Sequence, residues 1–173
     1  MLIFARPTAA SIATGLVLAI IGESIRFWGV AIAGSETRTT GPVGATNLIT
    51  DGPFAYVRNP LYAGNMLMYV GVGVMANALM PYLVIFAFCF FLFQYLMIVT
   101  KEEEYLRTVF GEEYDRYVQD VPRFIPRLTP YAGEHSFHRS AEISRGLHSE
   151  RRTLQAFGVL TVVLVIIYLL ERG

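Results

Sequence analysis

Long runs of apolar residues are the feature that most constrains how this chain folds. Three or four stretches of about 20 residues, the length that a helix needs to cross a bilayer, are almost free of charge. The charged residues are instead dense between Lys101 and Arg152. Inside a membrane, a helix satisfies all of its own backbone hydrogen bonds. We therefore predict an all-α integral membrane protein with a water-facing segment.

About four membrane-spanning helices follow from these runs. We expect them at residues 8–33, 60–79, 82–100 and 153–170. A short, uncharged turn from Asn77 to Pro81 separates the second span from the third, so these two spans form a tight antiparallel hairpin. Close approach of neighbouring helices is expected at the glycines of the second span, which are Gly64, Gly71 and Gly73.

The third apolar run passes directly into a charged sequence at Lys101. A helix that stopped here would place three carboxylates at its negative end, which is unfavourable. We therefore expect the helix to continue into water to about Phe110, with an inward stripe made of Ile98, Glu102, Leu106 and Val109. Glu103 lies four residues before Arg107, which predicts a surface ion pair.

The charged region that follows is expected to be a cytosolic helical segment and then a linker. A short helix over 112–119 places Tyr114 and Tyr117 on one face. Pro122 and Pro126, with Pro130 nearby, make 120–128 extended. The stretch 129–152 is a polar linker. Its His135 and His138 share the spacing of one helix face, but no third ligand is indicated, so we expect no metal site.

The start of the second span has the sequence Arg58-Asn59-Pro60. Asn59 suits a helix N-cap, and Pro60 suits the first helical position because its missing N–H needs no partner there. Arg58 then lies just outside the positive end of the helix, where an anion is readily held. In any membrane protein, however, Arg and Tyr also gather at the interface as simple anchors.

The distribution of basic residues predicts the orientation. Two arginines lie between the first two spans, nine basic residues lie between spans three and four, and the hairpin turn has none. Both charged segments are therefore predicted to be cytoplasmic, with both termini on the opposite side. Arg58 and Glu102 then lie at one membrane face. Together with the tyrosines they offer an anion site, carboxylates for a cation and aromatic walls, which would suit an amino-acid zwitterion joined to a flat base.

Four motifs in order resemble the isoprenylcysteine carboxyl methyltransferase family, whose broader relatives include phospholipid methyltransferases. They are Val57-Arg58-Asn59-Pro60-Leu61-Tyr62-Ala63-Gly64, Glu102-Glu103, Phe110-Gly111-x-x-Tyr114-x-x-Tyr117 and Val121-Pro122-Arg123-Phe124-Ile125-Pro126. The family commonly has His where this chain has Asn59. The resemblance covers roughly residues 25–128 and implies one methyltransferase domain over 1–173, with a catalytic core, the polar linker and an extra final span. For that span three roles stay open: packing, self-association and shaping the substrate entry.

What the resemblance implies is a membrane enzyme that uses S-adenosylmethionine and a lipophilic acceptor from the bilayer. The acceptor would be an isoprenylcysteine-like carboxylate, a phospholipid amine or a thiol. Arg58, Glu102 and Arg123 would be catalytic. The cofactor would be held by Arg58, Asn59, Pro60, Tyr62, Gly64, Glu102, Glu103, Tyr114 and Tyr117.

Two alternatives remain open at this point. One is an NADPH-dependent membrane reductase of the steroid reductase type, and the other is a non-enzymatic membrane assembly factor. Nucleic-acid binding is not expected, because 14 basic residues balance 14 acidic ones.

Overall fold

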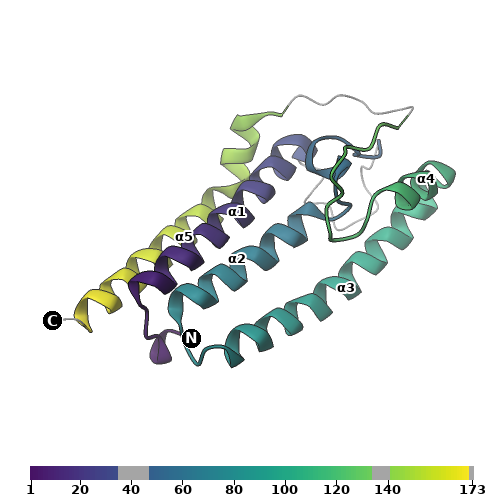
Figure 1. Ribbon diagram of the computed structural model, residues 1–173. Helices are drawn as coiled ribbons and strands as arrows, with labels where there is room; N and C mark the ends of the chain where they lie inside the picture. The colour runs from purple at the N-terminus through teal and green to yellow at the C-terminus, as the bar shows by residue number, and fades with distance from the viewer. Residues whose placement is uncertain (35–46, 134–140, 172–173) are drawn as a thin grey trace. The chain divides into compact units, whose positions relative to one another are not determined.

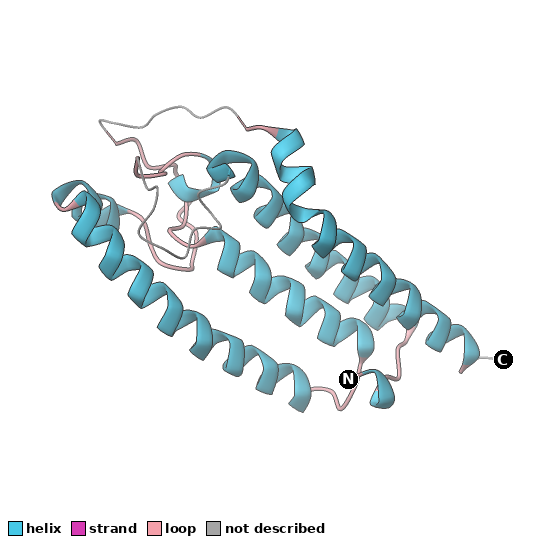
Figure 2. Ribbon diagram, turned by 180° about the vertical axis from the view of Figure 1, so that it is seen from behind, coloured by secondary structure: helices cyan, strands magenta, loops and turns pink. Residues whose placement is uncertain are grey.

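A computed structural model gives the fold and describes residues 1–34, 47–133 and 141–171. Its α-helices are α1 (Ala9–Ala33), α2 (Pro60–Ala76), α3 (Tyr82–Phe110), α4 (Glu112–Asp120) and α5 (Ile143–Leu170) (Figure 1). The described residues also form two short 3-10 helices, η1 (Leu2–Phe4) and η3 (Gly52–Ala55). None of the described residues forms a strand (Figure 2), so the all-α prediction is confirmed.

Three helices are long and apolar enough to cross a membrane, judged by length and composition: Ala9–Ala33, Tyr82–Phe110 and Gly146–Leu170. The fourth predicted span is the shorter apolar helix α2. It has 17 residues, ends at Ala76 and is followed directly by a turn. A helix of that length rises about 25 Å, a little less than the ~30 Å of a typical hydrocarbon core. The chain is an integral membrane protein.

The helix boundaries follow the predictions in most places. α3 runs on to Phe110 without a break, and α4 forms where the short helix was expected. The final helix begins at Ile143, ten residues before the predicted start of the span, because no proline interrupts 143–152 and the polar residues there extend the helix beyond its apolar part. His135, His138 and most of the loop 34–50 lie outside the described residues.

The described chain divides into two compact units. Unit 1 contains Met1–Ser24, Gly64–Gln94 and Glu150–Gly173, and unit 2 contains Ile25–Ala63 and Tyr95–Ser149. All of the predicted site residues except Gly64 belong to unit 2.

In unit 1, α1 and α2 touch along a glycine seam. A Cβ atom added at Gly15 would collide with the carbonyl oxygen of Gly71, and one added at Gly22 would lie 2.5 Å from that of Gly64. The two glycines on each helix are seven residues apart, so both fall on one face, and Ala19 between them is fully buried. The prediction of close packing at Gly64 and Gly71 is confirmed.

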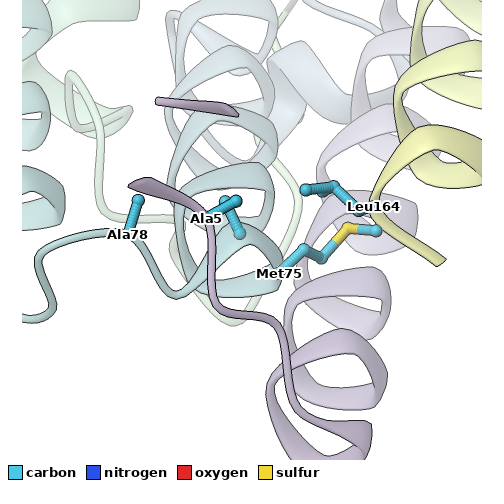
Figure 3. Close-up of a cluster of buried hydrophobic side chains, with 5 residues drawn as sticks. Ala5, Met75, Ala78 and Leu164 are labelled. Atoms are coloured by element: carbon cyan, nitrogen blue, oxygen red, sulfur yellow. The ribbon is translucent and has the colours of Figure 1, made fainter. Parts of the chain in front are cut away.

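A second feature of unit 1 ties the N-terminal segment to the end of α2. Ala5 belongs to an apolar cluster with Met75, Ala76, Ala78 and Leu164 (Figure 3). The Arg6 backbone N–H donates to the Ala76 carbonyl at 3.0 Å, and the Asn77 side-chain amide donates to the Arg6 carbonyl at 2.9 Å. The chain before α1 is therefore fixed by packing and by hydrogen bonds.

The outward face of α3 in unit 1 is strongly apolar. Large side chains are exposed there, among them Tyr82, Ile85, Phe86, Phe90 and Phe93. A water-facing helix would carry polar residues at these positions. This pattern is that of a helix surrounded by lipid.

Unit 2 contains a small aromatic core around α4. Tyr114, Tyr117 and Val121 are buried together, with exposed fractions of 1%, 3% and 0%. The Tyr117 hydroxyl donates to the Phe54 carbonyl oxygen at 2.7 Å, which ties α4 to η3.

Candidate functional site

The site is built on two backbone segments of unit 2, one before α2 and one after α4. The Arg58 N–H donates to the Pro122 carbonyl, and the Arg127 N–H donates to the Tyr56 carbonyl, both at 2.9 Å. The Tyr131 N–H donates to the Ala55 carbonyl, also at 2.9 Å. These bonds hold the segment before α2 alongside the proline-rich segment after α4.

The start of α2 has the predicted geometry. Pro60 is the first helical residue and is fully buried, and the Asn59 carbonyl accepts a hydrogen bond from the Ala63 N–H at 3.1 Å. The Asn59 side-chain Nδ2 donates to the Arg123 carbonyl at 3.3 Å and to Glu103 Oε1 at 3.5 Å. The amide therefore links α2, α3 and the segment that carries Arg123.

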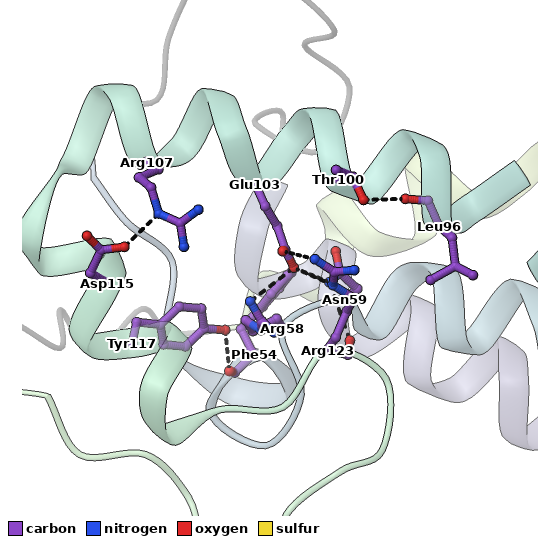
Figure 4. Close-up of polar contacts among 10 residues, drawn as sticks. All are labelled: Phe54, Arg58, Asn59, Leu96, Thr100, Glu103, Arg107, Asp115, Tyr117 and Arg123. Atoms are coloured by element: carbon purple, nitrogen blue, oxygen red, sulfur yellow. Dashed lines mark hydrogen bonds and ion pairs between the residues drawn. The ribbon is translucent and has the colours of Figure 1, made fainter. Parts of the chain in front are cut away.

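Glu103 is the centre of the polar cluster (Figure 4). Its Oε1 lies 3.1 Å from Arg58 Nη1 and accepts from Arg123 Nε at 3.2 Å, while its Oε2 accepts from Arg123 Nη2 at 2.5 Å. The Glu103 and Arg58 side chains are only 9% and 12% exposed, and that of Arg123 is 35% exposed. The hydrogen bond to Glu103 raises the pKa of the Arg123 guanidinium. One carboxylate thus holds two cations.

This arrangement corrects the predicted stripe on α3. The buried residues are Tyr95, Val99 and Glu103, four apart, so the inward face is shifted by one residue and Glu102 is exposed. The predicted surface pair between Glu103 and Arg107 is also wrong. Arg107 Nε binds Asp115 Oδ1 at 2.7 Å, because Glu103 points inward. Glu102 and Glu103 are neighbours in one charged stretch, so the sequence pattern fits either residue as the inward one. On a helix, however, their side chains point about 100° apart.

Glu102 still reaches a predicted site residue. It accepts a hydrogen bond from the Tyr62 hydroxyl at 2.8 Å, and the Tyr62 ring lies 4.8 Å, centroid to centroid, from the ring of buried Tyr95. Tyr95 was not predicted to be part of the site. The spacing of four residues between Tyr95, Val99 and Glu103 is the signal that identifies it.

The remaining predicted residues, Tyr114, Tyr117 and Gly64, are mainly packed against other parts of the protein. Tyr114 and Tyr117 lie in the aromatic core, and burial raises the pKa of both phenols, that of Tyr114 to about 12. Glu103 also raises the Tyr114 pKa, and Arg58 opposes that effect. Gly64 faces Gly22 of α1 within unit 1. Arg58, Asn59, Glu103 and Arg123 are brought together, and Pro60, the residue after Asn59, is fully buried.

The chemistry available here is recognition of charged groups. Arg58 lies at the positive end of α2, and its buried Nε has no hydrogen-bond partner among the described residues. An exposed carboxylate, Glu102, stands on the neighbouring helix. In the described part of the chain, no group of three or more metal-ligating side chains occurs.

Comparison with known proteins extends the picture. A protein of Cupriavidus metallidurans named cobalt-zinc-cadmium resistance protein CzcN is 34% identical over 121 residues, which cover 69% of this chain and 50% of that protein. The protein-S-isoprenylcysteine O-methyltransferase of Schizosaccharomyces pombe is 35% identical over 85 residues, 47% of this chain and 34% of that one. A probable protein-S-isoprenylcysteine O-methyltransferase of Oryza sativa subsp. indica is 35% identical over 117 residues, 65% of this chain and 59% of that one.

This chain therefore spans between about a third and three fifths of the length of these relatives. No solved structure matches it significantly. The sequence profile of the phospholipid methyltransferase family matches residues 10–113, more than half of the chain. That match includes Arg58, Glu102 and Glu103 and ends just before Tyr114. The resemblance predicted from the motifs is confirmed, and the chain belongs to the phospholipid methyltransferase family.

Proposed function

We propose that this protein transfers a methyl group from S-adenosylmethionine to a lipophilic acceptor that resides in the membrane. The observation that carries the proposal is the buried Arg58 at the start of α2, with an unpartnered Nε among the described residues and with Glu102 on the next helix. The family match and the relatives named as isoprenylcysteine O-methyltransferases support the same reaction.

The donor fits the charges of the cluster. Its methionine part carries one carboxylate and one ammonium group. Arg58 and the positive end of α2 suit the carboxylate, and exposed Glu102, fixed by Tyr62, suits the ammonium. Asn59 and Pro60 shape the helix start. Tyr114 and Tyr117 would then support the cofactor site through the aromatic core of unit 2, and Gly64 would contribute through the close packing of α2 on α1.

Glu103 takes a different part in this proposal. Its two oxygens already accept hydrogen bonds from Arg123 and Asn59 and form an ion pair with Arg58, so little capacity remains for a ligand. It acts as a positioning residue that fixes both guanidinium groups. Arg123, the more exposed of the two, is the one that faces the acceptor.

S-adenosylmethionine, when bound, supplies an electrophilic methyl group on a sulfonium. In the transfer, the methyl–sulfur bond would break as an electron pair of the acceptor bonded to the methyl carbon, and S-adenosylhomocysteine, a neutral thioether, would leave. The protein's part is to align donor and acceptor and to exclude water. A carboxylate or thiolate acceptor needs no base, whereas an ammonium acceptor must first lose a proton. We place the site on the cytoplasmic side of the membrane and both termini on the opposite side, as the distribution of basic residues predicts. If the protein self-associates, we propose that the final helix forms the contact.

Cofactor binding is the first test. Titration calorimetry with S-adenosylhomocysteine should show binding that Arg58→Ala weakens by about tenfold or more, the effect of losing one charged contact. Glu102→Ala should act similarly. Arg116→Ala, on the exposed face of α4, is the matched control and should leave the affinity unchanged. Absence of binding both in detergent and in nanodiscs, or preference for NADPH, would contradict the proposal.

The acceptor is identified by a second measurement. Purified protein in nanodiscs is supplied with S-adenosylmethionine that carries a radiolabelled methyl group and with a lipid extract of the host. The labelled product is then separated and analysed. Base-labile label indicates a carboxyl ester, whereas base-stable label in the phospholipid fraction indicates an amine.

A further inference from the structure

Two large apolar side chains project into solvent from the segment that carries Arg123. Ile125 is 79% exposed and Leu128 is 99% exposed. Both lie outside the helices that are candidates for membrane spans. Single exposed apolar residues are common, but these two lie in one short segment that also carries Arg123 and Arg127.

The exposure of this pair is fixed by the backbone. Segment 122–131 is held by the hydrogen bonds from Arg58 to Pro122, from Arg127 to Tyr56 and from Tyr131 to Ala55. The Arg127 guanidinium also donates to the Asp120 carbonyl at 3.2 Å and to Thr129 Oγ1 at 3.4 Å. Since three prolines further restrict the segment, a small rotation does not hide the two side chains.

The segment contacts residues at two transitions between apolar and charged sequence, one just after the apolar part of α3 and one just before α2. Arg123 binds Glu103, which follows the end of the apolar part of α3 by three residues. The Arg123 carbonyl accepts from Asn59, the residue directly before the apolar helix α2. In a membrane protein, this transition between apolar and charged residues marks the headgroup region.

The composition of the segment fits the same level. Residues 121–131 contain two arginines and no acidic residue. A mixture of basic and apolar side chains is typical of segments that lie in the membrane interface, where arginines attract anionic headgroups. The occupant that fits both the charge and the position is the lipid surface.

We propose that Ile125 and Leu128 insert into the headgroup region and hold the Arg58–Glu103–Arg123 cluster against the bilayer. Lipid would then border the site at Arg123. The inference deepens the proposed function, because it states where a lipid acceptor meets the site. The membrane contact itself is measured without turnover, so its failure and a failure of the proposed methyl transfer are distinguishable.

The test places one tryptophan on the segment. In a Trp28→Phe background, which removes the native tryptophan, Leu128→Trp is reconstituted into vesicles of phosphatidylcholine and phosphatidylglycerol. Bromine atoms are placed near the headgroup end of the acyl chains. Gln119→Trp in the same background is the matched control, because Gln119 is exposed on α4.

We expect brominated lipid to lower the fluorescence of the Leu128→Trp variant roughly twofold, as for a residue at the acyl boundary, and to leave that of the Gln119→Trp control nearly unchanged. Aqueous iodide should quench only the control. Iodide quenching of the Leu128→Trp variant without bromine quenching would overturn the inference. Protection of that variant from both quenchers would also overturn it, since protein would then cover the segment.

A second variant tests the link to the acceptor. Ile125→Ser combined with Leu128→Ser should raise the KM for the lipid acceptor several-fold and leave the affinity for S-adenosylhomocysteine unchanged. An unchanged KM, with bromine quenching observed, would overturn the link between this contact and acceptor access. Failure of the parent protein to bind S-adenosylhomocysteine would count against the proposed function alone.

Discussion

A single carboxylate, that of Glu103, holds two guanidinium groups in a largely buried cluster. Its neighbours Glu102 and Glu104 are exposed. When one partner of a buried ion pair is removed, the remaining charge stays buried without compensation. Glu103 should therefore matter far more to stability than the carboxylates beside it.

Replacement of Glu103 by Gln should lower the free energy of unfolding by about 3 kcal/mol, since Arg58 and Arg123 lose their counter-charge. Thermal unfolding in detergent, followed by size-exclusion chromatography, measures the effect. Glu104→Gln is the matched control, because Glu104 is exposed one position along the same helix. Equal unfolding temperatures for the two variants would show that the cluster contributes little.

Tyr114 gives a prediction about alkaline pH. Its pKa is raised to about 12 in the folded state, from an ordinary value of 10.0, mainly by burial. A raised pKa favours the protonated form of the folded protein, so this stabilisation is complete below about pH 10 and is lost as pH rises toward about 12. Unfolding temperature should fall across that window. Tyr114→Phe should reduce the slope, whereas Tyr105→Phe, at an exposed position, should not.

At the scale of whole elements, the glycine seam between α1 and α2 leaves no room for a side chain. A Cβ atom at Gly71 would lie 2.6 Å from the Gly15 carbonyl oxygen and 2.7 Å from the Ala19 backbone nitrogen. Both neighbours are backbone atoms, which cannot rotate away. The helices would have to separate along their contact.

Gly71→Ala should therefore destabilise the protein by roughly 1–3 kcal/mol, as overpacking does. Gly158→Ala on α5 is the control, because an added Cβ there meets no atom within 4 Å. That control should cost nothing, since alanine favours a helix over glycine. Unfolding temperatures of the two variants decide the matter, and similar values would mean that the seam tolerates a methyl group.

The elements themselves could largely be predicted from the sequence, because hydrophobic runs and proline positions determine them locally. The continuation of α3 to Phe110 follows from charge at a helix end. The sequence does not predict which of Glu102 and Glu103 turns inward, because both fit the same helix. Only the positions of Arg58 and Arg123, which are distant in sequence, decide it. The backbone bond between Arg58 and Pro122 is likewise non-local. Such pairing leaves no periodic pattern in the sequence.

At the scale of the whole molecule, the bilayer is the solvent for much of the surface. Cys89, the one cysteine of the chain, is exposed on α3 among large apolar side chains. Exposure on this helix should mean contact with lipid and not with water.

Cys89 should therefore react slowly with a charged, membrane-impermeant thiol reagent in open membrane fragments and rapidly after denaturation in detergent. A charged reagent enters the hydrocarbon region only at a high free-energy cost, which is the physical reason for the low rate. Gln119→Cys in a Cys89→Ser background is the exposed control and should react at once. Equal rates at both positions would contradict the membrane placement of α3.

The cluster at Glu103 also has a consequence for the order of events during synthesis. Asn59 takes its partners from residues 44 and 64 positions further along the chain. At the usual rate of about 5–20 residues per second, those partners leave the ribosome on the order of several seconds after Arg58 and Asn59 do. Through that interval α2 must enter the membrane with an arginine at its start that has no counter-charge. The cluster is completed only when α3 and the segment after α4 have been made.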